Sequence, residues 1–311
     1  MSIQGIVSTY LMLDGWLEFN RVKWGLQVLK LRLSEEGKGI PAIEAVFYLD
    51  KRDRIYMPRL NPYLPIIFIP TPTESVPRLY RQWLGVSGLL AEEFISRGLA
   101  STVVLSPEIT DIREWKWRGF QSDVRYTYFI DLPYSLEWAD SSTRNKISKA
   151  NKNGFICERA LVSDDILSCL KDTEERKGFN YDLTLRDLQL AHELLGEEGF
   201  RIYACYAPNG EVASARIALH LPGVRALDWV AGTRIQYLQS GATQLLIAFM
   251  LDDLAAESAT GLDFAGANNR VVAAAKANFG GRITPYYIIS APSVKSLAGH
   301  IKGIWQFQRG S

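Results

Sequence analysis

The stretch from Gly261 to Gly281, GLDFAGANNRVVAAAKANFGG, predicts a strand end, a tight turn and a short helix of small residues with one lysine. That lysine, Lys276, lies three positions before Phe279, close to the expected end of the helix. A lysine in the last turn of a helix can interact with the helix dipole. Alternatively, its ammonium group can project into a site that handles negative charge. The sequence leaves both roles open.

Three carboxylates are candidates for a general base, the group that would remove a proton from a reacting amine. Asp228 lies on the expected strand LDWV, and Asp263 ends the strand that precedes the turn. Glu44 is a polar residue on the apolar strand IEAVFYLD. Each of the two aspartates could equally be a capping or turn residue, and Glu44 could place a carboxylate between two domains.

The segment YLQSGATQLL predicts the start of a long helix over residues 240–258. The first N–H groups of a helix have no partner within the helix, and the helix dipole favours an anion there. Small side chains would let a phosphate approach the backbone closely. The candidate anion-binding residues are Gln239, Ser240, Gly241, Ala242 and Thr243. The alternative is an ordinary helix start with Ser240 as the N-cap.

Basic residues cluster in the expected helix before Gly154, at Arg144, Lys146, Lys149 and Lys152. They form either a solvated helix face or a local site for the phosphate of a nucleotide-linked or lipid-linked acceptor. The loop RKGFNYDLT, residues 176–184, is a candidate substrate lid or an ordinary connection between helices. It supplies two candidate substrate-binding residues, Arg176 and Tyr181.

Two halves of the chain repeat the same order of elements: a long helix, a short strand, a short helix and a tyrosine-rich strand. This order predicts two tandem copies of one mixed α/β unit, in residues 1–133 and 134–311. Hydrophobic periodicity and turn signals predict helices over 75–97, 111–120, 163–177, 184–195 and 240–258, and strands over 26–33, 43–50, 101–106 and 124–132. Three further strands, FRIYACYAP, VASARIALHL and RALDWVAGT, form an expected antiparallel set whose first turn contains Asn209-Gly210.

Composition limits the function classes. The 311 residues include 35 Lys+Arg and 34 Asp+Glu, so the chain as a whole has no field that would draw it to nucleic acid or a membrane. Its three cysteines and three histidines are scattered, so we expect reduced thiols and no metal site. The N-terminus has no secretory signal pattern, and the apolar segment 62–70 is too short to span a bilayer, so we expect a cytoplasmic protein.

The second half resembles the GNAT N-acetyltransferase fold in its element order, and two motifs narrow the resemblance to its FemAB-like branch. One motif is the basic helix with Arg144, Ile147, Lys149, Ala150, Lys152 and Gly154. The other is formed by Gly261, Asp263, Phe264, Gly266, Asn268, Lys276, Phe279 and Gly280. That branch includes peptidoglycan interpeptide-bridge transferases and relatives of cellulose-biosynthesis acetyltransferases. The resemblance implies two tandem GNAT-like domains with mixed, mostly antiparallel sheets flanked by helices, the first copy degenerate.

The resemblance also implies roles. Acyl-CoA, such as acetyl-CoA, would be the donor, bound at residues 239–243 and Asn268, and Lys276 would contact its phosphate or the developing oxyanion. Arg144, Lys149, Arg176 and Tyr181 would bind the acceptor, a small-molecule, glycan-linked or peptide-linked amine of cell-wall or polysaccharide metabolism. Two departures are Ser240 and Ala242 in place of glycines, and Ala275 in place of an aromatic residue.

Three functions follow as hypotheses. The first is an N-acyltransferase in which the amine attacks the acyl donor directly. The second is an aminoacyl-tRNA-dependent peptidoglycan bridge transferase, although the chain shows no heptad run long enough for the coiled-coil arm that such relatives often carry. The third is a non-catalytic binding protein in which the altered donor motif no longer works.

Overall fold

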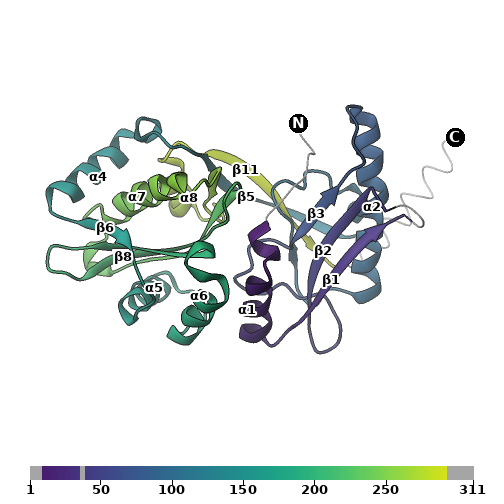
Figure 1. Cartoon of the computed structure of the whole chain (residues 1–311), viewed down its shortest axis with the longest axis horizontal. Coiled ribbons are helices and arrows are strands. Elements are labelled where there is room, and N and C mark those ends of the chain that lie inside the picture. Colours follow the sequence, from purple (N-terminus) through teal and green to yellow (C-terminus); the bar gives the residue numbers. More distant parts are fainter. Residues whose placement is uncertain (1–8, 36–38, 293–311) are drawn as a thin grey trace. The chain divides into compact units, whose positions relative to one another are not determined.

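The computed structural model describes residues 9–35 and 39–292 (Figure 1). The chain divides into two compact units, and each is described by itself. Residues 1–12, 20–125 and 285–311 make up the first unit, and residues 13–19 and 126–284 make up the second. The sequence predicted two continuous domains that divide at 133/134. The two compact units are not continuous in sequence, because the chain from residue 285 joins the first unit.

The first unit is built on a three-stranded antiparallel sheet in the order β1-β2-β3. Its elements are β1 (Gln27–Ser34), β2 (Ala42–Leu49), β3 (Ile66–Ile69), α2 (Val76–Arg97), β4 (Val103–Val104) and α3 (Arg113–Trp117). Helix α2 begins at the N-cap Ser75, whose side chain accepts from the N–H of Arg78, and ends at Gly98. Phe47, Trp83, Phe94 and Trp115 form the centre of an aromatic core with the sheet, α2 and α3.

The second unit holds most of an eight-stranded sheet, which includes β5 (Gln121–Asp131) and β11 (Arg282–Ser290) and has the order β4-β11-β5-β10-β9-β8-β7-β6. Its strands are β6 (Ile156–Arg159), β7 (Phe200–Tyr206), β8 (Val212–Leu219), β9 (Arg225–Thr233) and β10 (Gly261–Asp263). Its helices are α4 (Ser141–Lys152), α5 (Asp164–Lys177), α6 (Leu185–Gly199), α7 (Ala242–Ala256) and α8 (Arg270–Ala277). Within this unit α4 and α7 lie on one side of strands β6 to β8, and α5 and α6 lie on the other (Figure 1).

Strands β5 (Gln121–Asp131) and β11 (Arg282–Ser290) each begin in one unit and end in the other. Helix α1 (Asp14–Trp24) is likewise divided between the units. The predicted repeat is present as α2, β4, α3, β5 in one half and α7, β10, α8, β11 in the other. The mixed α/β fold class predicted by the sequence is therefore confirmed.

Local signals explain where several elements begin and end. Thr184 and Asp187 form the predicted capping box of α6, each side chain accepting from the other residue's N–H. Gly178 ends α5 in the left-handed conformation. Helix α7 carries apolar residues on nearly every side, because it packs on the sheet along one face and beside α4 along another.

Candidate functional site

Lys276 is held inside the second unit by the loop that precedes its own helix. Its ammonium donates to the carbonyl oxygen of Gly266 at 2.6 Å and to that of Phe264. An ammonium has three N–H donors, and two acceptors are present among the described residues. One N–H group of Lys276 is therefore left for another acceptor. The side chain turns back towards the loop between β10 and α8, whereas the sequence had left open whether it interacts with the helix dipole or projects into a site that handles negative charge.

Burial sets the protonation behaviour of this lysine. Loss of water lowers the pKa of Lys276 to about 8, and the positive charges of Arg216 and Lys177 act in the same direction. The carboxylates of Asp228 and Asp263 raise it in part. Four ionisable groups from β8, β9, β10 and α5 therefore influence the pKa of one lysine, and strongly shifted groups of this kind often mark functional sites.

Asp228 is engaged by Arg216 in a buried, two-point ion pair. Both residues are at least 94% buried, and Nε of Arg216 lies 3.1 Å from Oδ1 of Asp228. The pair exists because the register of β8 and β9 shifts: Ile217 faces Val230 while Ala218 faces Asp228. This bulge turns Asp228 to the sheet face that Arg216 occupies.

Asp263 shapes the loop whose carbonyl groups hold Lys276. Its Oδ1 accepts from the hydroxyl of Thr127 at 2.5 Å and from the N–H of Ala265 at 2.8 Å. The N–H of Gly266 donates in turn to Thr127 at 3.0 Å. Ala265 and Gly266 have positive φ values of 52° and 100°, which the bonds of Asp263 and Thr127 help to hold. Asp263 therefore positions Lys276 through the backbone.

Asn268 supports the same loop from its other end. Its side-chain oxygen accepts from the N–H of Tyr126 at 2.9 Å, and its side-chain nitrogen donates to the carbonyl oxygen of Tyr126 at 3.3 Å. The side chain is thus joined to the backbone of β5. Asn268 was expected to bind the donor, and in the structure its amide anchors the loop.

The start of α7 brings together the residues predicted to bind an anion. Gly241 is the N-cap with φ of 89°, and a Cβ there would collide with the carbonyl oxygen of Lys146 on α4. The hydroxyl of Ser240 accepts from the N–H of Ala242 at 3.1 Å and donates to Tyr237. Gly241 itself has no side chain to cap the helix, so the N–H groups that follow Ala242 remain suited to an anion.

A chain of three hydroxyls runs from this helix start into the sheet. Ser214 donates to the carbonyl oxygen of Gly232 at 3.0 Å, so Thr233 must be the donor in the 2.9 Å contact between Thr233 and Ser214. Because the single hydroxyl proton of Thr233 is then directed to Ser214, Thr243 is the donor in its 2.8 Å contact with Thr233. The proton of Thr243 is therefore used inside the protein, and its free lone pairs make it an acceptor towards the helix start.

The basic helix α4 lies beside this helix start. Nζ of Lys149 donates to the carbonyl oxygen of Gln239 at 3.3 Å. A residue predicted to bind the acyl acceptor therefore contacts a residue predicted to bind the acyl donor. Lys146 and Lys152 are exposed on the same helix. Arg144 instead donates to the carbonyl oxygens of Glu137 and Ala139, before the helix.

The remaining predicted residues have mainly structural contacts. Arg176 donates to the carbonyl oxygen of Thr233 at 3.3 Å, and the Tyr181 hydroxyl donates to that of Ala231 at 3.1 Å. The first contact joins the last turn of α5 to β9, and the second joins the loop after α5 to the same strand. Glu44 belongs to the first unit, where its carboxylate pairs with Arg32 on β1.

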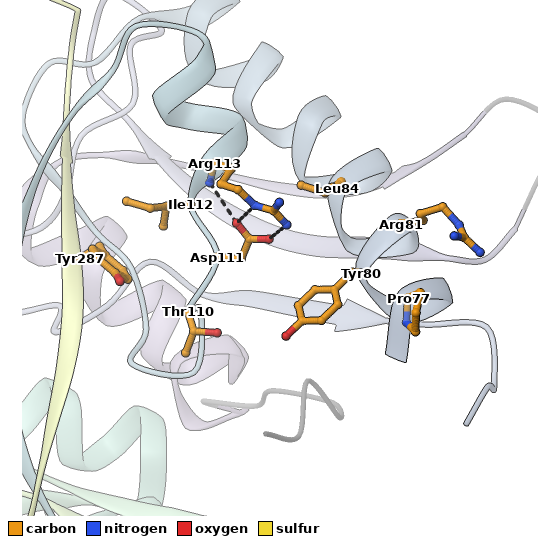
Figure 2. Close-up of a pocket in the computed structure, with 9 residues that line it drawn as sticks. All are labelled: Pro77, Tyr80, Arg81, Leu84, Thr110, Asp111, Ile112, Arg113 and Tyr287. Atoms are coloured by element: carbon orange, nitrogen blue, oxygen red, sulfur yellow. Dashed lines mark hydrogen bonds and ion pairs between the residues drawn. The ribbon is translucent and has the colours of Figure 1, made fainter. Parts of the chain in front are cut away.

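A cavity of about 780 Å³ lies in the first unit, between the start of α2, the loop before α3 and β11. Figure 2 shows the two-point pair of Asp111 and Arg113, with O–N distances of 2.9 and 2.7 Å, near the ring of Tyr80. The lining residues are Pro77, Tyr80, Arg81, Leu84, Thr110, Asp111, Ile112, Arg113 and Tyr287. None of the predicted site residues is among them.

The sequence did not point to Arg216, Thr127 or the hydroxyl pair Ser214 and Thr233. Arg216 did carry a signal, because a lone arginine within the apolar strand VASARIALHL needs a buried partner. The others are small polar residues, and only the sheet register brings them together. Among residues 9–35 and 39–292, no cluster of three or more metal-binding side chains occurs. The helices in these ranges also include none long and apolar enough to cross a membrane.

No protein-family model and no curated protein sequence matches the chain. Solved structures do match it over most of its length. FemX shares 13% identity over 91% of this chain and 96% of its own, with a TM-score of 0.63. The C-terminal domain of a putative lysylphosphatidylglycerol synthetase from Agrobacterium fabrum shares 12% identity over 90% and 89%, with a TM-score of 0.56. L-PGS from Bacillus licheniformis shares 10% identity over 88% of each chain, with a TM-score of 0.52.

At these identities the similarity is one of fold. It extends through both units, because each match covers at least 88% of this chain. The chain therefore has the fold of FemX and of the lysylphosphatidylglycerol synthetase C-terminal domain, which confirms the FemAB-like resemblance that its motifs predicted.

Proposed function

We propose that the protein is an N-acyltransferase that moves an acyl group from acyl-CoA to an amino group by direct attack. The observation that carries this proposal is the partly buried side chain of Lys276, whose ammonium has two N–H groups fixed by backbone carbonyl oxygens and one left to donate. A fixed cation in a site poor in water stabilises a developing oxyanion strongly, because no reorganisation is needed when the charge appears.

In the proposed reaction the amine nitrogen attacks the acyl carbonyl carbon and forms a tetrahedral intermediate. Its oxyanion accepts the third N–H of Lys276. The carbon–sulfur bond then breaks, the thiolate of the donor leaves, and the proton of the amine passes to that thiolate or to water. Positioning of the two substrates supplies the rest of the rate enhancement.

The carboxylates have positioning roles in this proposal. Asp228 is fully engaged by Arg216, and Asp263 accepts from Thr127 and from Ala265. Both carboxylates are thus oriented and occupied by groups of the protein itself. The acceptor amine would therefore have to lose its proton without help from either aspartate.

The donor's phosphates would lie at the start of α7. No side chain of the N-cap Gly241 occupies the first N–H groups of the helix there, and Lys149 brings a positive charge to Gln239. Thr243 would accept from an N–H or O–H group of the donor, since its own proton is directed to Thr233. The acceptor would be a small-molecule, glycan-linked or peptide-linked amine of cell-wall or polysaccharide metabolism.

A second donor is favoured by one observation, the exposed basic face of α4. Lys146, Lys149 and Lys152 stand on a helix with no acidic residue between Ser141 and Lys152. Such a surface suits a longer polyanion, so an aminoacyl-tRNA ester is the alternative donor. The same attack and the same role of Lys276 would apply, with a ribose oxygen as the leaving group.

Thermal unfolding with acetyl-CoA, coenzyme A or an aminoacyl-tRNA tests the donor. A ligand at 100 times its dissociation constant stabilises the folded protein by about 2.7 kcal/mol. We expect acetyl-CoA and coenzyme A to raise the unfolding midpoint, and Gly241→Ala to abolish the rise. A shift with aminoacyl-tRNA alone would select the second donor. No shift with any of them would overturn both proposals in favour of a binding protein without transferase activity.

A further inference from the structure

Two of the three cysteines face each other on neighbouring strands beneath α7. Cys157 on β6 and Cys205 on β7 are direct partners in the antiparallel register. Cys205 is fully buried and Cys157 is half-buried. The sequence predicted reduced thiols, since the three cysteines are odd in number and lie in unrelated segments.

The register also determines the kind of pair. The N–H of Ala160 donates to the carbonyl oxygen of Ile202 at 2.9 Å, which makes Ala160 and Ile202 a hydrogen-bonded pair. Pairs alternate along an antiparallel ladder, so Cys157 and Cys205 occupy a non-hydrogen-bonded position. The Cα atoms of such pairs are about 4.5 Å apart, and disulfides join Cα atoms that are about 4.4–6.8 Å apart.

The thiols interact directly. A hydrogen bond with Cys205 and burial together raise the pKa of Cys157 far above its usual value. Cys169, in contrast, lies on α5 on the other side of the sheet, where its thiol contacts the carbonyl oxygen of Val212 at 3.5 Å. The chain thus contains one thiol pair and one separate thiol.

The cysteine pair is part of a cross-strand row that leads to the proposed donor site. Cys205 faces Ser214 on β8, and Ser214 faces Thr233 on β9. Thr233 bonds to Thr243 in the first turn of α7. Cys205 also belongs to the core cluster that contains Leu246 of that helix. A bond between the two sulfur atoms would therefore form in the same cross-strand row as Thr233, within the core on which α7 packs.

We propose that Cys157 and Cys205 are a modification site, at which a small-molecule disulfide such as glutathione disulfide converts the two thiols into a cross-strand disulfide. Cys157, the more accessible thiol, attacks as its thiolate and breaks the S–S bond of the reagent, which releases one glutathione thiolate. Cys205 then attacks the sulfur of Cys157 and releases the second. The protein is oxidised by two electrons, glutathione is reduced, and the two thiol protons pass to the released thiolates.

The test treats the full-length protein with glutathione disulfide, then unfolds it and blocks the remaining thiols with an alkylating agent. Mass spectrometry should find the peptide of Cys157 joined to that of Cys205, with Cys169 alkylated. The rate should be slow at neutral pH and rise with pH, because only the thiolate reacts and the pKa of Cys157 is raised. The product should unfold several degrees higher than the reduced protein, and dithiothreitol should reverse both changes.

Cys157→Ser and Cys169→Ser are the matched variants. Cys169→Ser should form the same cross-link, and Cys157→Ser should form none and show no change in unfolding midpoint. The proposal fails if glutathione stays attached to Cys157 without a cross-link, if Cys169 enters the bond, or if the thiols remain reduced at high pH and excess reagent. These readouts need no transferase activity, so they remain decisive if the proposed function is wrong.

Discussion

Lys276 donates to the carbonyl oxygen of Gly266 at 2.6 Å, ten residues earlier in the chain, so the helix α8 and the loop before it fix one ammonium group between them. The loop is in turn shaped by Asp263 and Thr127. The cation is thus held in place before any substrate arrives.

Replacing Lys276 by methionine should lower the rate of acyl transfer. Methionine keeps an unbranched side chain but offers no N–H to the oxyanion, and loss of one such donor costs about 10²–10³ in turnover. Single-turnover measurements with saturating donor should show this loss. Donor affinity should change little, as measured by titration calorimetry. If Lys276→Met keeps both turnover and affinity, Lys276 has no role in the reaction.

The rate should fall as pH rises through about 8, because the pKa of Lys276 is lowered to about 8 and the ammonium is the active form. Lys276→Arg keeps a charge that no accessible pH removes. In this variant the falling limb of the pH–rate profile should disappear, even though the overall rate is lower. An unchanged limb in Lys276→Arg would assign it to another group.

The lowered pKa of Lys276 should also make the free energy of unfolding of the substrate-free protein depend on pH. The pKa of Lys276 is about 8 in the folded protein and about 10.4 in an unfolded chain. Between these values the unfolded chain binds more protons, so the free energy of unfolding contributed by this group rises with pH. Urea unfolding of the unsubstituted protein should give a higher free energy of unfolding at pH 9.5 than at pH 7.5. This difference should be smaller in Lys276→Met. Equal rises would contradict the lowered pKa.

Breaking the pair of Arg216 and Asp228 should destabilise the protein strongly. Each single variant, Arg216→Met or Asp228→Leu, leaves one uncompensated buried charge, which costs about 3–5 kcal/mol. The double variant should recover much of that loss, because it removes both charges. Urea unfolding of all four proteins measures the coupling energy. Additive losses would show that the two side chains are independent.

Gly241→Ala should destabilise the protein and weaken donor binding. The substitution combines a strained positive φ with a collision between its Cβ and Lys146 on α4. Gly223→Ala is the matched control, with a φ of 79° but open space around the added methyl group. We expect about 1–2 kcal/mol for Gly223→Ala from φ strain alone and a clearly larger loss for Gly241→Ala. Equal losses would mean that α4 and α7 can separate freely.

Most elements could be predicted because their signals are local. The capping box of α6, the glycine after α5 and the periodicity of α2 each depend on residues within a few positions of one another. Local signals placed the start of helix α7 less accurately. The helix was expected from Ser240, but Gly241 is the N-cap and the helix begins at Ala242. The side chain of Ser240 helps to form the turn before the helix.

The site was harder to predict because its contacts are distant in sequence. Glu44 was a candidate base from its place in an apolar strand, yet the register of β1 and β2 pairs it with Arg32. Asp228 was a candidate from its place on the strand LDWV, and Asp263 from its place at the end of the strand before the turn. Both are engaged by partners that no local pattern could reveal.

The sequence alone determined the order of elements, the two motifs and hence the FemAB-like fold, together with the presence of a lysine in α8 and small residues at the start of α7. Tertiary structure decided what those residues do. It turned Lys276 towards the carbonyl groups of its own loop, placed Lys149 beside Gln239, and set Cys157 opposite Cys205. The physical reason is that helix and turn preferences act over a few residues, whereas strand register and burial depend on the whole sheet.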